Sequence, residues 1–272
     1  MYTADFETIV DPIETRLWAW SSCQIGNVDN VKFGNSDESF MEWIYSFKKS
    51  TKIYFHNLKF DGEFLFYIFN KHGLKYYNIK AQEESRSIPE GHYSTLINAE
   101  GSQWYSIKLC IKRKGKRVIN IEFLDSSKII PSSVEDIAIN FDLPMKKGDI
   151  DYLAFREVGH ELTEDEIDYI KKDVQIMSLA LEQMFNINLK RMTIGSNAMF
   201  NFKETLHSKS QYNYLFPVLP YDRDLRQSYR GGWVYCNPKI KGKNIEKGIS
   251  LDVNSLYPWA MYDNPLPIGE GI

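Results

Sequence analysis

The segment Tyr2–Thr8 most constrains the fold, because it places two acids on one face of a strand. Apolar or aromatic residues occupy positions 2, 4 and 6, whereas Asp5 and Glu7 occupy odd positions. Since strand side chains alternate between faces, both carboxylates point the same way. An acidic pair beside a core is costly unless a divalent cation or another partner compensates it. We therefore predict half of a metal site here; the alternative is a solvated strand face.

The composition is that of an ordinary globular protein. The chain has 272 residues, of which 43% are hydrophobic and 25% charged, enough for one large or two smaller domains. Its net charge of −3 argues against non-specific coating of nucleic acid, but a local groove or cleft is still allowed. Three widely spaced cysteines fit a reducing cytoplasm. Neither a signal peptide nor a long apolar run is apparent, so we expect no membrane span.

A third acid stands at the start of a predicted helix. Strands at 17–26 and 31–33 and a helix over about 37–49 precede a strand at 52–56, which runs into a helical pattern beginning near Asp61. The loop or helix start after a strand is where a fold often presents functional groups. Asp61 is therefore a candidate ligand, and a simple helix cap is the alternative.

The middle of the chain predicts a hairpin. Residues 73–101 are polar and indicate a loop with one strand near 93–99. Residues 103–111 and 118–125 alternate like paired strands around a basic tip at 112–117. Such a tip could track a phosphate backbone or be a solvated turn.

The strongest helix pattern begins at Thr163, which forms a predicted capping box with Glu166. Tyr169 and Asp173 are four residues apart, so they share one face of this helix. A tyrosine hydroxyl above an aspartate can orient a water beside a metal; a surface hydrogen bond is the alternative. A lysine of the loop 146–149, before the helix, could reach a reacting phosphate; the alternative is two ordinary surface lysines.

A change of composition around residues 186–191 predicts that a first domain, 1–187, is followed by a second, 188–272. The segment Tyr229–Trp233 combines a cation, aromatic residues and two glycines, which let a backbone approach a ligand; an ordinary glycine turn between strands is the alternative. A last strand is predicted at 249–254, where Asp252 is either a ligand or a turn former.

The acids of the first domain together suggest metal-dependent chemistry on a phosphodiester. Hard divalent cations such as Mg²⁺ take oxygen ligands and keep open positions for substrate phosphate. Two such ions about 4 Å apart activate a water and stabilise the leaving oxygen. The four candidate ligands are Asp5, Glu7, Asp61 and Asp173.

These motifs, in this order, resemble the N-terminal part of the protein-primed family B DNA polymerases of the bacteriophage type. Residues 5–8, 56–61 and 169–173 resemble the three exonuclease motifs of that family. Residues 229–232 resemble the motif between its exonuclease and polymerase domains, and residues 252–258 resemble its first polymerase motif. The resemblance covers nearly the whole chain.

The resemblance implies an α/β fold, in which a ribonuclease H-like 3′–5′ exonuclease domain is followed by an incomplete family B polymerase palm. It implies two Mg²⁺ or Mn²⁺ ions held by the four acids, with Tyr169 orienting the attacking water and Lys147 near the scissile phosphate. It also implies single-stranded and primer–template DNA as partners, a terminal protein as primer, and the cytoplasm of a bacterial host. The residues that match DNA-holding positions are Thr8, Asn57, Phe60, Phe64, Ser126, Tyr152, Tyr229, Arg230, Gly231 and Gly232.

Some of these matches have plain structural alternatives, and two departures limit what the resemblance implies. Both phenylalanines could be core, and Asn57 could be a turn former. Ser127 stands where the family usually has leucine, which weakens one primer contact. Asp252 matches a catalytic metal ligand and Tyr257 a residue that contacts the incoming nucleotide. The later motifs that complete the polymerase site have no counterpart here, so we expect no DNA synthesis by this chain alone.

Three functional classes are consistent with these features. The leading hypothesis is the proofreading exonuclease with the first piece of the palm. A non-catalytic remnant that binds single-stranded DNA or a partner is the main alternative, and binding would persist in a chelator whereas hydrolysis would not. A stand-alone nuclease is a third class, for which the segments 229–232 and 252–258 have no evident use.

Overall fold

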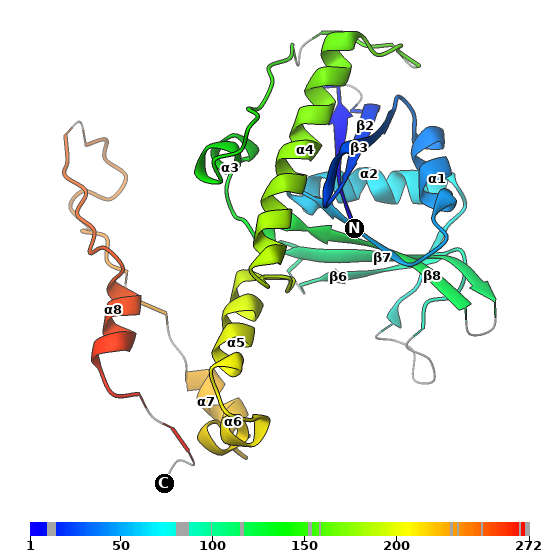
Figure 1. Cartoon of the computed structure of the whole chain (residues 1–272). Coiled ribbons are helices and arrows are strands. Elements are labelled where there is room, and N and C mark those ends of the chain that lie inside the picture. The colour runs from blue at the N-terminus through cyan, green and yellow to red at the C-terminus, as the bar shows by residue number, and fades with distance from the viewer. Residues whose placement is uncertain are drawn as a thin grey trace. The chain divides into compact units, whose positions relative to one another are not determined.

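A computed structural model describes the greater part of the chain. The residues described are 1–9, 15–79, 87–98, 100–114, 117–151, 154–157, 159–228, 231–232, 234–245, 247–266 and 268–269. The chain divides into two compact units, Met1–Ala198 (unit 1) and Met199–Ile272 (unit 2) (Figure 1). The functional domain boundary at residues 187 and 188 stays a prediction.

Unit 1 is organised around one mixed sheet. Its strands are β1 (Tyr2–Thr8), β2 (Leu17–Gln24), β3 (Asn27–Gly34), β4 (Thr51–Phe55), β5 (Lys75–Tyr76), β6 (His92–Ile97), β7 (Trp104–Lys114) and β8 (Arg117–Asp125). Their order in the sheet is β3-β2-β1-β4-β8-β7-β6-β5. β1 is antiparallel to β2 and parallel to β4. The strand that carries the two acids is therefore an interior strand.

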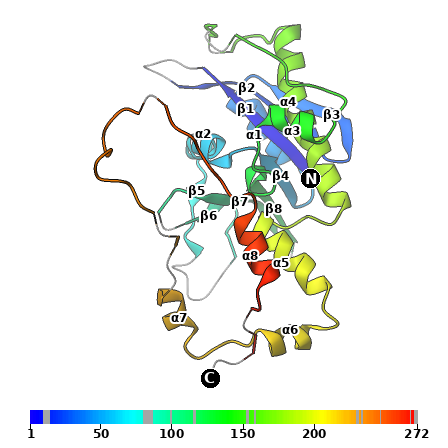
Figure 2. The same ribbon diagram turned by 90° about the vertical axis from the view of Figure 1, so that its left-hand side faces the viewer.

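Helices cover both faces of this sheet (Figures 1 and 2). α1 (Asp37–Ser46) and α2 (Leu58–Lys71) pack on one face, in a core that takes in even-numbered side chains of β1. α3 (Val134–Asn140) and α4 (Glu164–Asn186) lie on the other face, around a second core. Because strand side chains alternate, the two acids of β1 point to the face that α4 covers.

Hydroxyl groups of the sheet hold α4 in position. Thr3 Oγ1 donates a hydrogen bond to the carbonyl of Val174 at 2.7 Å. Ser21 Oγ does the same to the carbonyl of Ile170, also at 2.7 Å. The two carbonyls are one turn apart and flank Asp173, so these bonds set which part of α4 lies over β1.

The turn between β4 and α2 positions the third predicted acid. Asn57 adopts the left-handed conformation, with φ of 71°, and its N–H donates to Asp125 Oδ1 at 3.1 Å. Asp61 lies in the first turn of the helix that follows. A Cβ on Gly62 would lie 2.6 Å from the ring of Trp104, so the absence of a side chain lets α2 approach β7 this closely.

Most predicted elements of unit 1 are confirmed. The capping box of Thr163 and Glu166 forms with both of its hydrogen bonds. The predicted hairpin is β7 and β8, although Gly115 and Lys116 of its basic tip lie outside the described residues. A single 3₁₀ turn, η2 (Ser126–Lys128), follows β8. Helix α1 ends at Ser46, earlier than the predicted end near residue 49.

Unit 2 consists of short helices. α5 (Ile194–Glu204) runs into it from unit 1, followed by α6 (Lys209–Leu215), α7 (Asp222–Ser228) and α8 (Leu256–Asp263). The strand predicted at 249–254 is wrong: these residues have no regular structure, and Ile249, Leu251 and Val253 are exposed. A strand needs a neighbour for its backbone groups, and the described part of unit 2 contains none.

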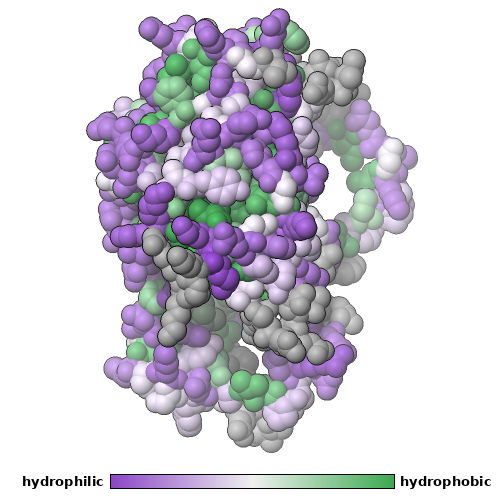
Figure 3. Space-filling model, turned by 90° about the vertical axis from the view of Figure 1, so that its right-hand side faces the viewer, coloured by the Kyte–Doolittle hydropathy of each residue, from purple (hydrophilic) through white to green (hydrophobic). Residues whose placement is uncertain are grey.

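No described helix has the length and apolar character needed to cross a membrane. The face of the molecule in Figure 3 carries mainly hydrophilic side chains, with hydrophobic ones in small areas between them.

Candidate metal centre

Three of the four predicted ligands come together in unit 1. Asp5 and Glu7 project from β1 and Asp173 from α4, and ligand oxygens of all three lie within 4.8 Å of one another. Glu7 and Asp173 are buried and Asp5 is partly buried. The spacing suits one cation shared among carboxylates. The two acids that the alternation in β1 placed on one face therefore lie beside the acid predicted on α4.

Asp61 lies beside this cluster. Its side chain is buried, and Oδ1 accepts a hydrogen bond from the N–H of Phe6, the residue between Asp5 and Glu7, at 3.3 Å. The negative charge of Asp61 is also the largest of the charges that raise the pKa of Asp5. The fourth predicted acid is therefore an electrostatic neighbour of the three-acid cluster, attached to the backbone of β1.

The carboxyl groups hold protons more tightly than ordinary acids. Burial first, and then the charges of Asp61, Glu7 and Asp173, raise the pKa of Asp5 well above its usual range. Burial, followed by the charge of Asp173, raises the pKa of Glu7 to about 7. Burial also raises the pKa of Asp61 and of Asp173. Buried like charges are unfavourable together, so a bound cation would relieve them.

The residues present fit a hard divalent cation. Oδ1 of Asp173 is buried and, among the described residues, has no hydrogen-bond partner. A buried carboxylate oxygen without a donor is costly, and a metal ion is one way to satisfy it. The cluster offers only oxygen ligands, which are those that Mg²⁺ and Mn²⁺ prefer.

Two predicted polar groups contact Asp173. The hydroxyl of Tyr169, one turn earlier on α4, hydrogen-bonds to its carboxylate. Nζ of Lys147 lies 3.4 Å from its Oδ2. The loop that carries the lysine also packs on the tyrosine, since a Cβ on Gly148 would meet the ring at 3.1 Å. The predicted sharing of one helix face by Tyr169 and Asp173 is confirmed.

The predicted DNA-holding residues of unit 1 lie around the β4–α2 turn and the end of β1. Phe60 is 49% exposed on the first turn of α2, and its ring lies 5.4 Å from that of the half-buried Phe64. Asn57 is exposed, and Thr8 is partly buried at the end of β1. Two aromatic rings at a surface offer a stacking platform for bases.

Ser126 and Tyr152 are the other two residues of unit 1 that match DNA-holding positions. Ser126 is buried, and its hydroxyl donates to the carbonyl of Phe55 at 2.9 Å and lies 3.0 Å from His56 Nδ1. The side chain therefore also connects β8 to the end of β4. Tyr152 lies outside the described residues.

The predicted residues of unit 2 form no metal site of their own. Asp252 is exposed and belongs to no group of described acids that could hold a cation. Tyr257, on α8, is exposed as well, and a Cβ on Gly232 would come within 3.4 Å of its hydroxyl. Gly231 has no regular structure, and Tyr229 and Arg230 lie outside the described residues.

Sequence reasoning missed two buried polar residues near the centre. Asp125 accepts the N–H groups of Asn57 and Ser127, and so holds the turn before α2. Arg156 is buried beside Glu166, and its charge lowers the pKa of Glu7. Asp125 ends the alternating segment 118–125, where an acid reads as the start of a turn, and Arg156 belongs to no periodic pattern, so neither residue is distinguished in the sequence from a surface charge.

Comparisons with known proteins agree on one family. The family model described as "DNA polymerase type B, organellar and viral" matches residues 45–272. The DNA polymerase of Bacillus phage B103 is 44% identical over 274 residues, which are 100% of this chain and 46% of that protein. The DNA polymerase of Streptococcus phage Cp-1 is 30% identical over 286 residues, covering 98% of this chain and 46% of that protein. The chain thus spans about half the length of these relatives.

Solved structures agree with the sequence matches. The orthorhombic crystal form of phi29 DNA polymerase matches with a TM-score of 0.86 and 39% identity, over 98% of this chain and 45% of that chain. The phi29 DNA polymerase complexed with single-stranded DNA matches with a TM-score of 0.85 and 39% identity, over 100% of this chain and 46% of that one. The mixed α/β fold is therefore that of the corresponding region of phi29 DNA polymerase. This chain belongs to the organellar and viral type B DNA polymerases.

Proposed function

We propose that unit 1 is a ribonuclease H-like, metal-dependent 3′–5′ exonuclease that shortens single-stranded DNA. The observation that carries the proposal is the cluster of Asp5, Glu7 and Asp173, whose oxygens lie within 4.8 Å of one another. The buried Oδ1 of Asp173, which has no hydrogen-bond partner among the described residues, supports a cation as the missing partner. Within a polymerase of this family, such an activity would remove mismatched 3′ nucleotides.

Each residue of the centre has a role in this proposal. Asp5, Glu7, Asp173 and the adjacent Asp61 would hold two Mg²⁺ or Mn²⁺ ions. Bound ions of this kind lower the pKa of a water and stabilise the charge on a leaving oxygen. The hydroxyl of Tyr169, held beside Asp173, would orient the attacking water.

The proposed DNA contacts are made to phosphate by Lys147 and to bases by two phenylalanines. The ammonium of Lys147 would approach a non-bridging phosphate oxygen, because it already lies against a carboxylate of the centre. The exposed ring of Phe60 and its neighbour Phe64 would stack on unpaired bases, a contact that tolerates any sequence. The structures of phi29 DNA polymerase with single-stranded DNA and with primer–template DNA and incoming nucleotides support these partners.

For the whole protein we propose protein-primed DNA synthesis in the cytoplasm of a bacterial host, with a terminal protein as primer. Unit 2 would be the start of the polymerase palm, with Asp252 as a metal ligand and Tyr257 at the incoming nucleotide. Tyr229, Arg230, Gly231 and Gly232 would contact DNA between the two activities. A two-metal site needs more than one carboxylate, so Asp252 alone does not support nucleotide transfer.

The test is degradation of a 5′-labelled single-stranded oligonucleotide in Mg²⁺. We expect stepwise shortening from the 3′ end, which a chelator stops and which the double variant Asp5→Ala, Glu7→Ala lacks. The well-folded double variant is the control for a contaminating nuclease. Binding of the oligonucleotide that persists in a chelator, with no shortening in Mg²⁺, would instead support a non-catalytic DNA-binding remnant.

A further inference from the structure

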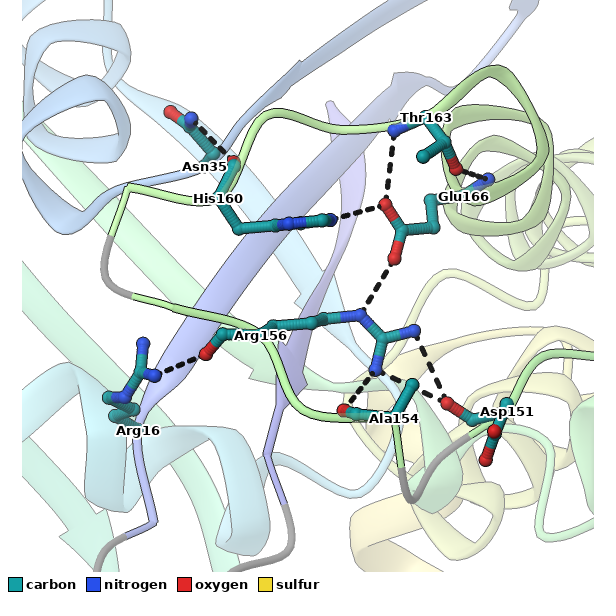
Figure 4. Close-up of polar contacts among 8 residues, drawn as sticks. All are labelled: Arg16, Asn35, Asp151, Ala154, Arg156, His160, Thr163 and Glu166. Carbon is teal, nitrogen blue, oxygen red and sulfur yellow. Dashed lines mark hydrogen bonds and ion pairs between the residues drawn. The ribbon is translucent and has the colours of Figure 1, made fainter.

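A network of buried charges fastens the loop between α3 and α4 to the sheet and to the start of α4 (Figure 4). Arg156, in this loop, is only 4% exposed. Its Nε lies 2.7 Å from Glu166 Oε1, in the first turn of α4. The guanidinium also lies 4.1 Å from the ring centroid of Trp18 on β2. A charge so deeply buried is rare unless it is paired.

The same guanidinium closes the loop on itself. Nη1 donates to the carbonyls of Asp151 at 3.2 Å and Ala154 at 3.1 Å, and Nη2 donates to Asp151 at 3.2 Å. The carbonyl of Arg156 in turn accepts a hydrogen bond from Arg16, which precedes β2. The rigid fork of arginine thus fixes the path of the backbone a few residues beyond Lys147.

Glu166 joins this loop to α4 through its second oxygen. Oε2 accepts the N–H of Thr163 at 3.0 Å and lies 2.7 Å from His160 Nε2. The carbonyl of His160 accepts a hydrogen bond from Asn35, after β3, at 2.9 Å. Glu166 therefore completes the capping box of α4 and also binds two side chains of the loop, Arg156 and His160.

The other end of the loop lies on the metal centre. Lys147 Nζ is 3.4 Å from Asp173 Oδ2, and Gly148 packs on the ring of Tyr169. Ile150 and Leu162 pack against the small core that contains Tyr169. The described parts of the loop are thus attached to α4 at two points, Glu166 and Asp173. Movement at the first attachment would displace the second.

We propose that Arg156 and Glu166 are a positioning pair, which sets where the ammonium of Lys147 stands relative to the carboxylates of the centre. This inference rests on the proposed exonuclease function. A buried ion pair adds little net stability, because the loss of hydration offsets its attraction, whereas its geometry is specific. The apolar contacts of Ile150 and Leu162 hold the loop on the unit, and the ion pair fixes its exact path.

The first test is a double-mutant cycle on the hydrolysis of single-stranded DNA. Glu166→Gln removes the charge and keeps a side chain that completes a capping box, so α4 should stay intact. We expect it to lower kcat by about tenfold to a hundredfold, as a small misplacement of a reacting group does, with little change in KM. In a Lys147→Ala background the same substitution should have no further effect. Effects that multiply would overturn the inference.

Matched variants separate geometry from charge. Glu164→Gln removes an exposed acid from the same turn of α4 and should leave kcat unchanged. Arg156→Lys keeps the positive charge but not the fork, and should lower kcat as Glu166→Gln does. If Arg156→Lys keeps full activity, Arg156 supplies charge rather than geometry, and the inference fails.

A second readout does not depend on nuclease activity. In the metal-free protein, Glu166→Gln should speed hydrogen exchange in peptides that contain Lys147 and Gly148, whereas Glu164→Gln should not. If Glu166→Gln speeds this exchange but the parent protein has no nuclease activity, the positioning pair is supported and the proposed function is rejected. Nuclease activity with unchanged exchange would reject the positioning pair alone.

Discussion

The raised pKa of Glu7 predicts an unusual dependence of stability on pH. Without metal, burial and then the charge of Asp173 raise the pKa of Glu7 from its ordinary value of 4.5 to about 7 in the folded protein. Between these two values the folded state keeps a proton that the unfolded state has lost. Stability therefore falls as pH rises from about 4.5 to about 7, and stays low above that. Glu7→Gln, which cannot ionise, should remove this fall.

The size of the effect follows from the shift. A change from 4.5 to about 7 corresponds to about 3 kcal/mol, since each pKa unit is 1.36 kcal/mol. Glu7 is buried, so solvent screens little of this. For a domain the size of unit 1, the melting temperature of Glu7→Gln should exceed that of the parent by roughly 6–12 °C at pH 8. At pH 4.5 the two should differ little.

Thermal melts followed by tryptophan fluorescence in a chelator, from pH 4.5 to 8, would measure this difference. Glu42→Gln, which changes an exposed acid of α1, is the control. Added Mg²⁺ should raise the melting temperature of the parent at pH 8 more than at pH 5, because protons compete with the cation. If Glu7→Gln raised the melting temperature equally at every pH, the reasoning would be refuted, because the gain would then come from packing rather than from charge.

Three further predictions concern packing, DNA binding and synthesis. Gly62→Ala should destabilise the protein by about 1–3 kcal/mol in a denaturant titration, because its Cβ would lie 2.6 Å from an indole ring, whereas Gly195→Ala, with no atom within 4 Å, should not destabilise it. Phe60→Ala should weaken single-stranded DNA binding by about 1–3 kcal/mol in a fluorescence titration, whereas Tyr67→Ala, which removes a more exposed aromatic ring from α2, should have no effect. Primer-extension assays should show no nucleotide incorporation by this chain. Measurable incorporation would contradict the argument that Asp252 alone cannot support nucleotide transfer.

Local patterns predicted the parts of unit 1 that are locally determined. The alternation in β1 placed Asp5 and Glu7 on one face, and the spacing of Tyr169 and Asp173 placed both on one side of α4. Each inference needed only the geometry of a single element. β1 and α4 meet because each also carries an apolar face that must be buried. That the two elements pack together was expected from the family resemblance and not from any local pattern.

What could not be predicted depends on contacts between distant segments. Arg156 reads as a surface charge until the loop folds over β2 and α4 and buries it against Glu166. Conversely, residues 249–254 have the alternation of a strand, but the described part of unit 2 gives them nothing to pair with. Strand propensity reflects neighbours more than backbone preference, so sequence alone overstates it at this position.

The separation of the proposed metal ligands along the chain has a consequence for synthesis of the protein. Asp5 and Glu7 are made well before Asp173, which lies near the end of unit 1 and approaches them only when α4 packs on the sheet. Contacts of such long range form late in folding, because the intervening chain must first be ordered. On the ribosome, the emerging chain would therefore carry half of the proposed metal centre until α4 is complete, and the proposed nuclease site would exist only in the folded domain.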